Sequence, residues 1–416
     1  MDYQVIVIGG GSSGLMAAVQ AASQGVRVLL IEKNPKLGRK LLLSGGGRCN
    51  VTNRTTREEL IRHIPGNGKF LYSALNQFDQ EDIVAFFESR GIALKEEDHG
   101  RMFPISDSAR TILEALVNEL YALNVTILTN TAVEGLLFAE DEARVIGVKT
   151  ADGKHYHAKS VVLAVGGRAY PRTGATGDGY AWAKAAGHTI ERLYPTESPL
   201  LSNDSFITSR ALQGVSLQNV KVTVWDDQHQ AITQHQMDMI FTHFGYSGPA
   251  ILRCSGHVNQ WLHQTGKTTC RLSIDLQPNL SLSELQAQAE AARDKMVLTI
   301  LKQWVPERLA DVICQLASFD PSIAYKQLTH AQQAKLFSLI QNFPLTAYGS
   351  QPIEKGFVTG GGVSTKEVNP KTMESKQMKG LFFCGELLDI NGYTGGYNIT
   401  AAFVTGTIAG WHAAWA

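Results

Sequence analysis

The chain has few cysteines, and none of them belongs to a recognisable metal or redox motif. The five are Cys49, Cys254, Cys270, Cys314 and Cys384, an odd number at wide spacing with no CxxC pair. This pattern argues against a disulfide framework and against a zinc site, and it fits a reducing cytosol. The first residues enter an apolar strand directly, so we expect a cytoplasmic protein without a secretory signal.

The chain also lacks an excess of charge and a long hydrophobic run. Lysine and arginine together number 38, and so do aspartate and glutamate. This balance does not favour a membrane surface or nucleic acid as a partner, and nucleic acid remains the less expected alternative. No run of about 18 residues is apolar enough to span a bilayer. The closest run, 399–415, is interrupted by Thr, Gly and His, and we expect it to be a buried helix.

Glycine, by contrast, is frequent, and its first cluster lies in a specific setting. An apolar run, Gln4–Ile8, is followed by GGGSSG at 9–14, an alanine-rich run, and a second apolar run, Val26–Ile31, closed by Glu32. This is the order of strand, GxGxxG turn, helix, strand and acid that a dinucleotide-binding βαβ unit requires. Glu32 lies 18 residues after Gly14, close to the usual spacing of about 20.

Each residue of this unit has a physical role. Gly9 permits the tight turn out of the strand, Gly11 lets a pyrophosphate approach the backbone, and Gly14 allows close packing of helix and strand. The helix N-terminus then offers free N–H groups to the phosphates. Glu32 can accept hydrogen bonds from both ribose hydroxyls and disfavours a 2′-phosphate, so the unit suits FAD or NAD rather than NADP.

Three further glycine-rich regions favour FAD. The loop at 38–50 carries basic residues whose charge we expect near the pyrophosphate, and its backbone N–H groups can wrap a phosphate or a flavin edge. The strand at 161–167, continued by glycines at 173–179, resembles the ATG-type motif of two-domain flavoproteins. A strand, an acid and a glycine cluster at 380–398 resemble the segment of glutathione-reductase-like flavoproteins that holds the ribityl chain and faces the flavin.

Together these motifs resemble one family, the BaiN/YhiN-like NAD(P)/FAD-dependent oxidoreductases. The matching runs are SGGGRCN at 44–50, GRMFP at 100–104, THFGYSGP at 242–249, GFVTGGGV at 356–363 and GELLDINGYTGGYN at 385–398. The resemblance implies non-covalent FAD, a Rossmann-type FAD domain, and an insertion with a β-barrel part and a helical part. Some members are assigned to reduction of conjugated C=C bonds in oxo-steroid bile acids. NAD(P)H is implied as an electron donor, yet the chain has only one GxGxxG unit.

The motifs and the resemblance together give a predicted set of cofactor-binding residues. The set is Gly9, Gly11, Ser12, Ser13, Gly14, Glu32, Lys33, Arg39, Lys40, Ser44, Gly45, Gly46, Arg48, Cys49, Asn50, Val133, Ala164, Gly166, Gly167, Gly385, Glu386, Gly392, Gly395, Gly396, Tyr397 and Asn398.

The predicted fold class is α/β, with one domain built from both ends of the chain. We expect residues 1–195 and 351–416 to form the Rossmann-type FAD-binding domain. A β-rich insertion at 196–280 and 344–350 and a helical insertion at 281–343 follow from short apolar runs and then helical periodicity. Capping-box patterns begin at Ser281 and at Thr329.

Catalytic residues are harder to predict, because a flavin carries out the hydride chemistry itself and leaves the protein to supply placement and one proton. Tyr393 is a candidate acid beside the flavin segment. His243 is a candidate proton donor, and Arg172 a candidate ligand for a substrate carboxylate or carbonyl. Cys49 and Cys384 lack the partner cysteine that a redox pair needs.

Three functions are consistent with this sequence. The first, which we favour, is an FAD-dependent oxidoreductase that reduces an unsaturated or oxo small molecule. The second is an FAD-containing RNA-modifying or RNA-associated protein, although no basic stripe with stacked aromatics supports it. The third is a flavin redox sensor with little turnover. Reduction of the flavin by NADH or NADPH, and its reoxidation by an enone, separates the three.

Overall fold

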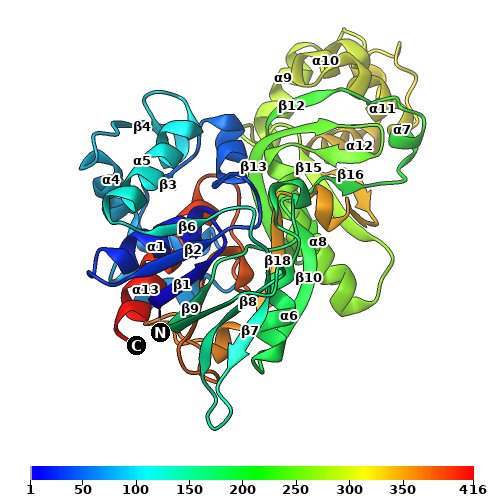
Figure 1. Cartoon of the computed structure of the whole chain (residues 1–416). Helices are drawn as coiled ribbons and strands as arrows, with labels where there is room; N and C mark the ends of the chain where they lie inside the picture. The colour runs from blue at the N-terminus through cyan, green and yellow to red at the C-terminus, as the bar shows by residue number, and fades with distance from the viewer. Residues whose placement is uncertain (1) are drawn as a thin grey trace. The chain divides into compact units, whose positions relative to one another are not determined.

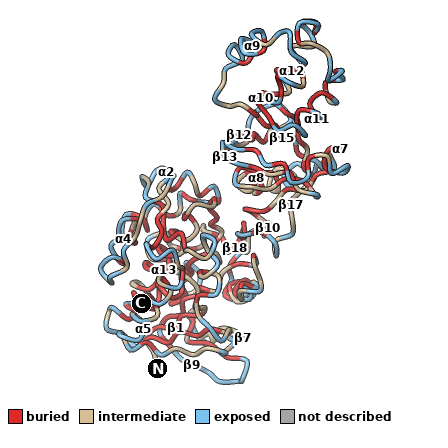
Figure 2. The backbone as a smooth tube through the Cα atoms, turned by 90° about the horizontal axis from the view of Figure 1, so that it is seen from above, coloured by how far each residue is buried: buried red, intermediate tan, exposed pale blue. Residues whose placement is uncertain are grey.

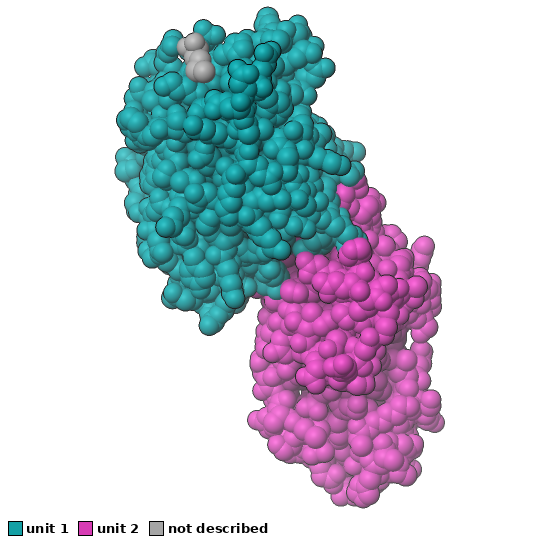
Figure 3. All heavy atoms as spheres, turned by 90° about the horizontal axis from the view of Figure 1, so that it is seen from below, with its two compact units in different colours: residues 1–194, 358–416 teal, residues 195–357 magenta. Residues whose placement is uncertain are grey.

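The computed structural model describes residues 2–416 and divides the chain into two compact units (Figure 3). Unit 1 comprises Met1–Tyr194 and Val358–Ala416, and unit 2 comprises Pro195–Phe357. The inserted strands and the inserted helices, which the sequence analysis assigns to two domains, fall together in unit 2.

Unit 1 is built on a parallel sheet with the strand order β6-β2-β1-β9-β19 (Figure 1). Its first elements confirm the predicted βαβ unit, because β1, α1 and β2 span Tyr3–Ile8, Ser12–Ala22 and Val28–Ile31. Most residues of β1 and β2 are apolar and buried, because both faces of a parallel sheet are covered. The remaining parallel strands are β6 (Thr126–Leu128), β9 (His155–Leu163) and β19 (Leu381–Phe383).

The C-terminal helix α13 (Tyr397–Trp415) packs against α1, so the two ends of the chain share one core (Figure 1). Figure 2, coloured by burial, shows buried residues around α13 and β1. Glycine makes this close approach possible. A Cβ at Gly406 would lie 2.4 Å from the carbonyl oxygen of Ser13, and one at Gly410 would lie 2.3 Å from that of Ala17. The expectation of a buried helix at 399–415 is confirmed, and no helix within residues 2–416 is long and apolar enough to cross a membrane.

Smaller elements complete unit 1. An antiparallel pair extends β9: β7 (Val133–Phe138) and β8 (Val145–Thr150). A three-stranded sheet has the order β3 (Thr52–Asn53), β5 (Arg101–Pro104), β4 (Leu94–Glu97). Strand β10 (Ile190–Thr196) pairs with β18 (Val358–Val363). The helices are α2 (Arg57–Arg62), α3 (Tyr72–Leu75), α4 (Gln80–Glu88), α5 (Ala109–Ala122) and α6 (Asp178–Ala185).

Unit 2 contains an antiparallel sheet with the order β16-β15-β12-β13-β14-β11-β17. Only Tyr348 separates the two edge strands β16 and β17 along the chain, so one nearly continuous segment joins both edges and the sheet curls like a barrel. The strands are β11 (Leu200–Leu201), β12 (Ser216–Trp225), β13 (Ala231–Phe241), β14 (Gly245–Ser247), β15 (Cys270–Asp275), β16 (Phe343–Ala347) and β17 (Gly349–Ser350).

Helices pack on this sheet around a second hydrophobic core. Both predicted capping boxes are confirmed, because the side chains of Ser281 and Thr329 each accept from the backbone N–H three residues on. The long helix α8 lies inside the region expected to be β-rich. The helices are α7 (Ser205–Thr208), α8 (Pro249–Thr265), α9 (Leu282–Ala291), α10 (Val297–Trp304), α11 (Glu307–Ala317) and α12 (His330–Gln341).

Candidate functional site

In the turn after β1, two glycines have no room for a side chain, whereas a third faces open space. A Cβ at Gly9 would lie 2.5 Å from the carbonyl oxygen of Ala164, and one at Gly14 would lie 1.8 Å from that of Gly9. A Cβ at Gly11 would meet no atom within 4 Å. Gly11 is also the N-cap of α1, and no side chain caps that end. The helix N-terminus is therefore open at the place where a pyrophosphate binds in such units.

Glu32 is held rigidly at the end of β2. Only 8% of the residue is exposed, and its carboxylate accepts from the backbone N–H of Gly10 at 2.7 Å. The other oxygen accepts from Asn34, from the backbone N–H at 2.8 Å and from Nδ2 at 2.6 Å. Asn34 was not predicted. The one signal in the sequence that could have revealed it is its position two residues after the acid, where its backbone N–H can reach the Glu32 carboxylate.

The loop at 41–49 turns in the left-handed region, with φ of 56° at Gly45, 68° at Gly46 and 61° at Cys49. Gly46, like Gly11, faces open space, because a Cβ there would meet nothing within 4 Å. Beside this loop, Oδ1 of Asn50 is buried without a hydrogen-bond partner, and a Cβ at Gly396 would lie 3.0 Å from it. An unsatisfied buried acceptor is costly, so this atom fits a ligand that carries an N–H donor.

The N-terminal end of α13 faces the same acceptor. Gly396 is its N-cap, with φ of 97° and no side-chain cap. The side chain of Asn398 accepts from the backbone N–H of Gly392 at 2.8 Å and donates to its carbonyl at 2.7 Å, which fixes the loop before the helix. The ring of Tyr397 stacks on His63 with a centroid distance of 4.6 Å.

The predicted basic residues have protein partners in this structure. Lys33 pairs with Asp178 at 2.5 Å, and Arg39 donates to Oδ1 of Asn34 at 2.6 Å. Lys40 pairs with Glu386 at 2.6 Å, and the Arg48 guanidinium with Glu97 at 2.8 Å and Asp107 at 3.2 Å. Hydrogen bonds from Arg48 are the main cause of a lowered pKa at Glu97. The positive charge expected near the pyrophosphate is therefore largely balanced within the protein.

Glu386 joins three segments of unit 1. Oε2 accepts from Lys40 and Oε1 accepts from the backbone N–H of Thr359 at 2.8 Å. The Thr359 hydroxyl in turn accepts from the N–H groups of Arg168 and Ala169, at 2.9 and 3.0 Å. Thr359 was not predicted as a site residue, although it lies in the GFVTGGGV run.

The other predicted cofactor residues lie around these contacts. A Cβ at Gly385 would lie 2.4 Å from Oγ of Ser13, and one at Gly167 would lie 2.4 Å from Oγ1 of Thr359. Gly166 has φ of 72°. The backbone N–H of Ala164 donates to Ile8. The remaining predicted residues also belong to unit 1. Ser12 begins α1, Ser44 donates to Leu41, Val133 begins β7, and the Gly395 carbonyl accepts from Asn53.

The catalytic candidates are distributed between the units. Tyr393 and Arg172 belong to unit 1, and His243 belongs to unit 2. Tyr393 is 8% exposed and meets His63 edge to face, whereas Arg172 and His243 are exposed. Burial raises the pKa of both the Cys49 and the Cys384 thiol to about 12, so neither is poised as a redox thiolate.

A parallel βαβ sheet with an open glycine-lined turn at its strand ends is the arrangement of a Rossmann-type dinucleotide-binding domain. The family match and the full-length relatives that follow identify the chain as an FAD-dependent oxidoreductase. The chain belongs to the HI0933-like family, whose Rossmann domain matches residues 3–412. The resemblance to BaiN/YhiN-like flavoproteins is thereby confirmed.

Named relatives match over the full length. The chain is 33% identical to "Ribosomal RNA dihydrouridine synthase" of Escherichia coli over 100% of this chain and 96% of the relative. It is 32% identical to "3-dehydro-bile acid delta(4,6)-reductase" of Clostridium scindens over 97% of both chains.

Solved structures share the fold at low sequence identity. A 3-ketosteroid Δ1-dehydrogenase from Sterolibacterium denitrificans aligns with a TM-score of 0.53 at 15% identity, over 99% of both chains. An E. coli quinol fumarate reductase subunit FrdA also gives 0.53 at 15% identity, over 100% of this chain and 70% of the other.

Proposed function

We propose that this protein uses non-covalently bound FAD to reduce a C=C bond conjugated to a carbonyl. The names of the two relatives describe one reaction type. Forming dihydrouridine adds hydrogen across a C=C bond next to a uracil carbonyl, and a Δ4,6-reductase of a 3-oxo bile acid saturates C=C bonds conjugated to its ketone. A carbonyl makes the far carbon of the C=C bond electrophilic, so hydride adds there and a proton adds next to the carbonyl.

The observation that carries the cofactor assignment is the open backbone at Gly11 and Gly46 together with the unsatisfied Oδ1 of Asn50. FAD, when bound, supplies the hydride chemistry. Gly11 would lie against its pyrophosphate and Glu32 would accept from the hydroxyls of its adenosine ribose, while Gly9 and Gly14 shape the turn. Asn50 would accept from the N–H of its ring system, and the N-terminus of α13 would offer N–H groups to the ring oxygens.

The protein must also supply a proton and hold the substrate carbonyl. Tyr393 is the candidate donor nearest to the proposed ring-binding segment in sequence, and a phenol is a competent general acid when placed within hydrogen-bond distance. Arg172 and His243 are candidates for the carbonyl, because both are exposed and both can donate. NAD(P)H is the proposed electron donor.

A small unsaturated ketone or enone is the substrate we favour, because basic and acidic residues are balanced over the chain. RNA is a second candidate, supported by relatives from E. coli and Haemophilus influenzae that are named ribosomal RNA dihydrouridine synthases, each at 33% identity. RNA binding normally leaves a basic footprint, which this composition does not provide.

The test begins with the purified protein. It should be yellow, and acid precipitation should release one FAD per chain into the supernatant. The reduced protein is then mixed without oxygen with a 3-oxo-Δ4 steroid, or with ribosomal RNA that lacks dihydrouridine.

Oxidation of the flavin by the enone, with a saturated product, supports the small-molecule proposal. A mass gain of two hydrogens on uridine supports RNA instead. A colourless protein that takes up no FAD contradicts the proposal as a whole.

A further inference from the structure

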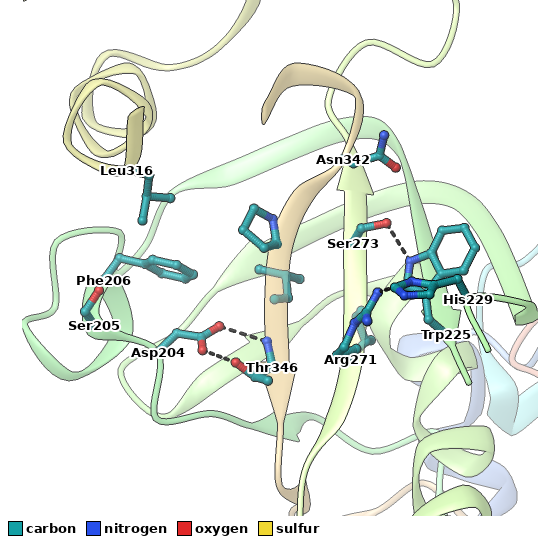
Figure 4. A pocket seen from close by; sticks show the side chains of 13 residues that line it. Asp204, Ser205, Phe206, Trp225, His229, Arg271, Ser273, Leu316, Asn342 and Thr346 are labelled. Atoms are coloured by element: carbon teal, nitrogen blue, oxygen red, sulfur yellow. Dashed lines mark hydrogen bonds between the residues drawn. The ribbon is translucent and has the colours of Figure 1, made fainter. Parts of the chain in front are cut away.

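Unit 2 contains a pocket of about 630 Å³ on one face of the strands β12, β15 and β16 (Figure 4). Register explains which side chains line it. Trp225 lies opposite Arg271, and Arg271 lies opposite Thr346, so the three form a cross-strand row. Side chains alternate between the faces of a strand, and Ser273, two residues after Arg271, shares this face. The volume lies within the range of small-molecule sites, about 300–1,000 Å³.

One end of the pocket carries the guanidinium of Arg271, which has no carboxylate within ion-pair distance among residues 2–416. The Arg271 guanidinium hydrogen-bonds to Nδ1 of His229 at 2.8 Å. A guanidinium has no acceptor, so Arg271 donates and His229 accepts. In the part of the chain that the structure describes, Arg271 forms no ion pair with a carboxylate. The neutral imidazole orients the guanidinium and leaves its charge available for an anion.

A flat aromatic surface stands beside this charge. Nε1 of Trp225 donates to Oγ of Ser273 at 2.9 Å, and the bond fixes the half-buried indole on the face of the sheet. Figure 4 shows Trp225, His229, Arg271 and Ser273 gathered at one side of the pocket. An aromatic ring of this kind is suited to stacking with a planar ligand.

The opposite side carries an anion. The carboxylate of Asp204 accepts from Tyr246 Oη, and from both the backbone N–H and the hydroxyl of Thr346. All three donors are neutral, so they stabilise the charge without cancelling it. Phe206 and Leu316 add apolar surface on this side. Asp204 therefore offers an acceptor to a ligand N–H at the edge of an apolar wall.

We propose that this pocket binds a nucleotide: a heteroaromatic base with N–H donors, joined through a sugar to a phosphate. The phosphate pairs with Arg271, the base lies against Trp225 and the apolar wall, and a base N–H donates to Asp204. The charges of the pocket select this class, because the ligand must carry an anion and a hydrogen-bond donor on a flat ring. All residues of this pocket belong to unit 2, whereas the proposed flavin-binding segments belong to unit 1.

The experiment uses the full-length protein loaded with FAD, so that nucleotides cannot enter the flavin site. Binding of UMP and AMP is measured by isothermal titration calorimetry, with uridine and inorganic phosphate as controls for the two halves of the ligand. We expect a nucleotide to bind at least about 10-fold more tightly than either half. A short single-stranded oligoribonucleotide distinguishes the sources. Tighter binding of the oligonucleotide assigns the site to an RNA strand, and equal binding assigns it to free nucleotides.

Two variants and one matched control test the residues. Arg271→Gln should weaken nucleotide binding by about 10-fold or more, and Trp225→Leu by roughly 5- to 150-fold, the range expected for a lost base stack. Arg293→Gln removes an exposed arginine of the same unit that lies outside the pocket, and it should bind as the unchanged protein does. FAD content and melting temperature report whether each variant is folded. Absence of nucleotide binding at millimolar concentration, or equal affinity of the Arg271 and Arg293 variants, overturns the proposal.

Discussion

Replacing Glu32 with alanine should weaken FAD binding. The carboxylate is the proposed acceptor for the ribose hydroxyls, and its orientation is set by Gly10 and Asn34. A hydrogen bond to a charged acceptor contributes about 1.5–3 kcal/mol, which corresponds to a loss of roughly 10- to 150-fold in affinity.

Glu32→Ala should also lower the stability of the protein in the absence of FAD. The alanine variant leaves the N–H groups of Gly10 and Asn34 without their acceptor, so the apoprotein should also melt at a lower temperature. Asn34→Ala separates the two effects, because it loosens the carboxylate without removing it. Its FAD affinity should fall by less than that of Glu32→Ala.

The assay is titration of FAD into each apoprotein, with quenching of flavin fluorescence as the signal. Glu88→Ala is the control, because Glu88 is an exposed acid at the end of α4. The dissociation constant of the control should match that of the unchanged protein. If Glu32→Ala and Glu88→Ala bind FAD within about threefold of each other, Glu32 is not the ribose ligand.

Three further predictions follow from the same geometry. Gly11→Val should abolish FAD loading but keep the melting temperature of the apoprotein, because no protein atom lies near that position. Gly14→Val should unfold the protein instead. A Gly11→Val variant with full FAD content would refute the assignment of Gly11. Cys49 and Cys384 should resist alkylation in the native protein near pH 8.5, the ordinary thiol pKa, because burial raises their pKa to about 12 and keeps the thiols protonated; reaction as fast as in denaturant would contradict this. NAD(P)H and a substrate analogue should compete, because no second GxGxxG unit follows residue 32 and hydride transfer needs contact of about 3–3.5 Å; rapid flavin reduction unaffected by the analogue would reveal a separate nicotinamide site.

The sequence predicts the parts of this protein that are set by local pattern. The βαβ unit and the capping boxes at Ser281 and Thr329 follow from residues that lie close together along the chain. The helix α8 was missed because its buried positions include Cys254 and Ser255, which give only a weak helical signal. Strand β18 was missed because glycines disfavour strands in isolation. Its Gly361 is required by the fold, since a Cβ there would lie 2.1 Å from the carbonyl oxygen of Arg192.

The sequence predicts the site residues whose role depends on local backbone geometry. It predicts less completely the contacts between residues that lie far apart along the chain. Gly11 is open, as its place in the fingerprint implies. The partners of Arg48 lie 49 and 59 residues away, so sequence alone could not reveal that Glu97 and Asp107 balance its charge. The contact between Thr359 and Glu386 likewise depends on the position of β18. The pocket beside Trp225 arises only from the register of three strands.

The central claim is that electrons held on FAD pass to a C=C bond conjugated to a carbonyl. A single-turnover experiment tests it most directly. The protein is reduced without oxygen, freed of excess reductant and mixed with a conjugated enone, and flavin oxidation and saturated product are measured in the same sample. One molecule of saturated product is expected for each flavin oxidised. A flavin that stays reduced with both the enone and the uridine-containing RNA, and is oxidised only when oxygen is admitted, would contradict this claim.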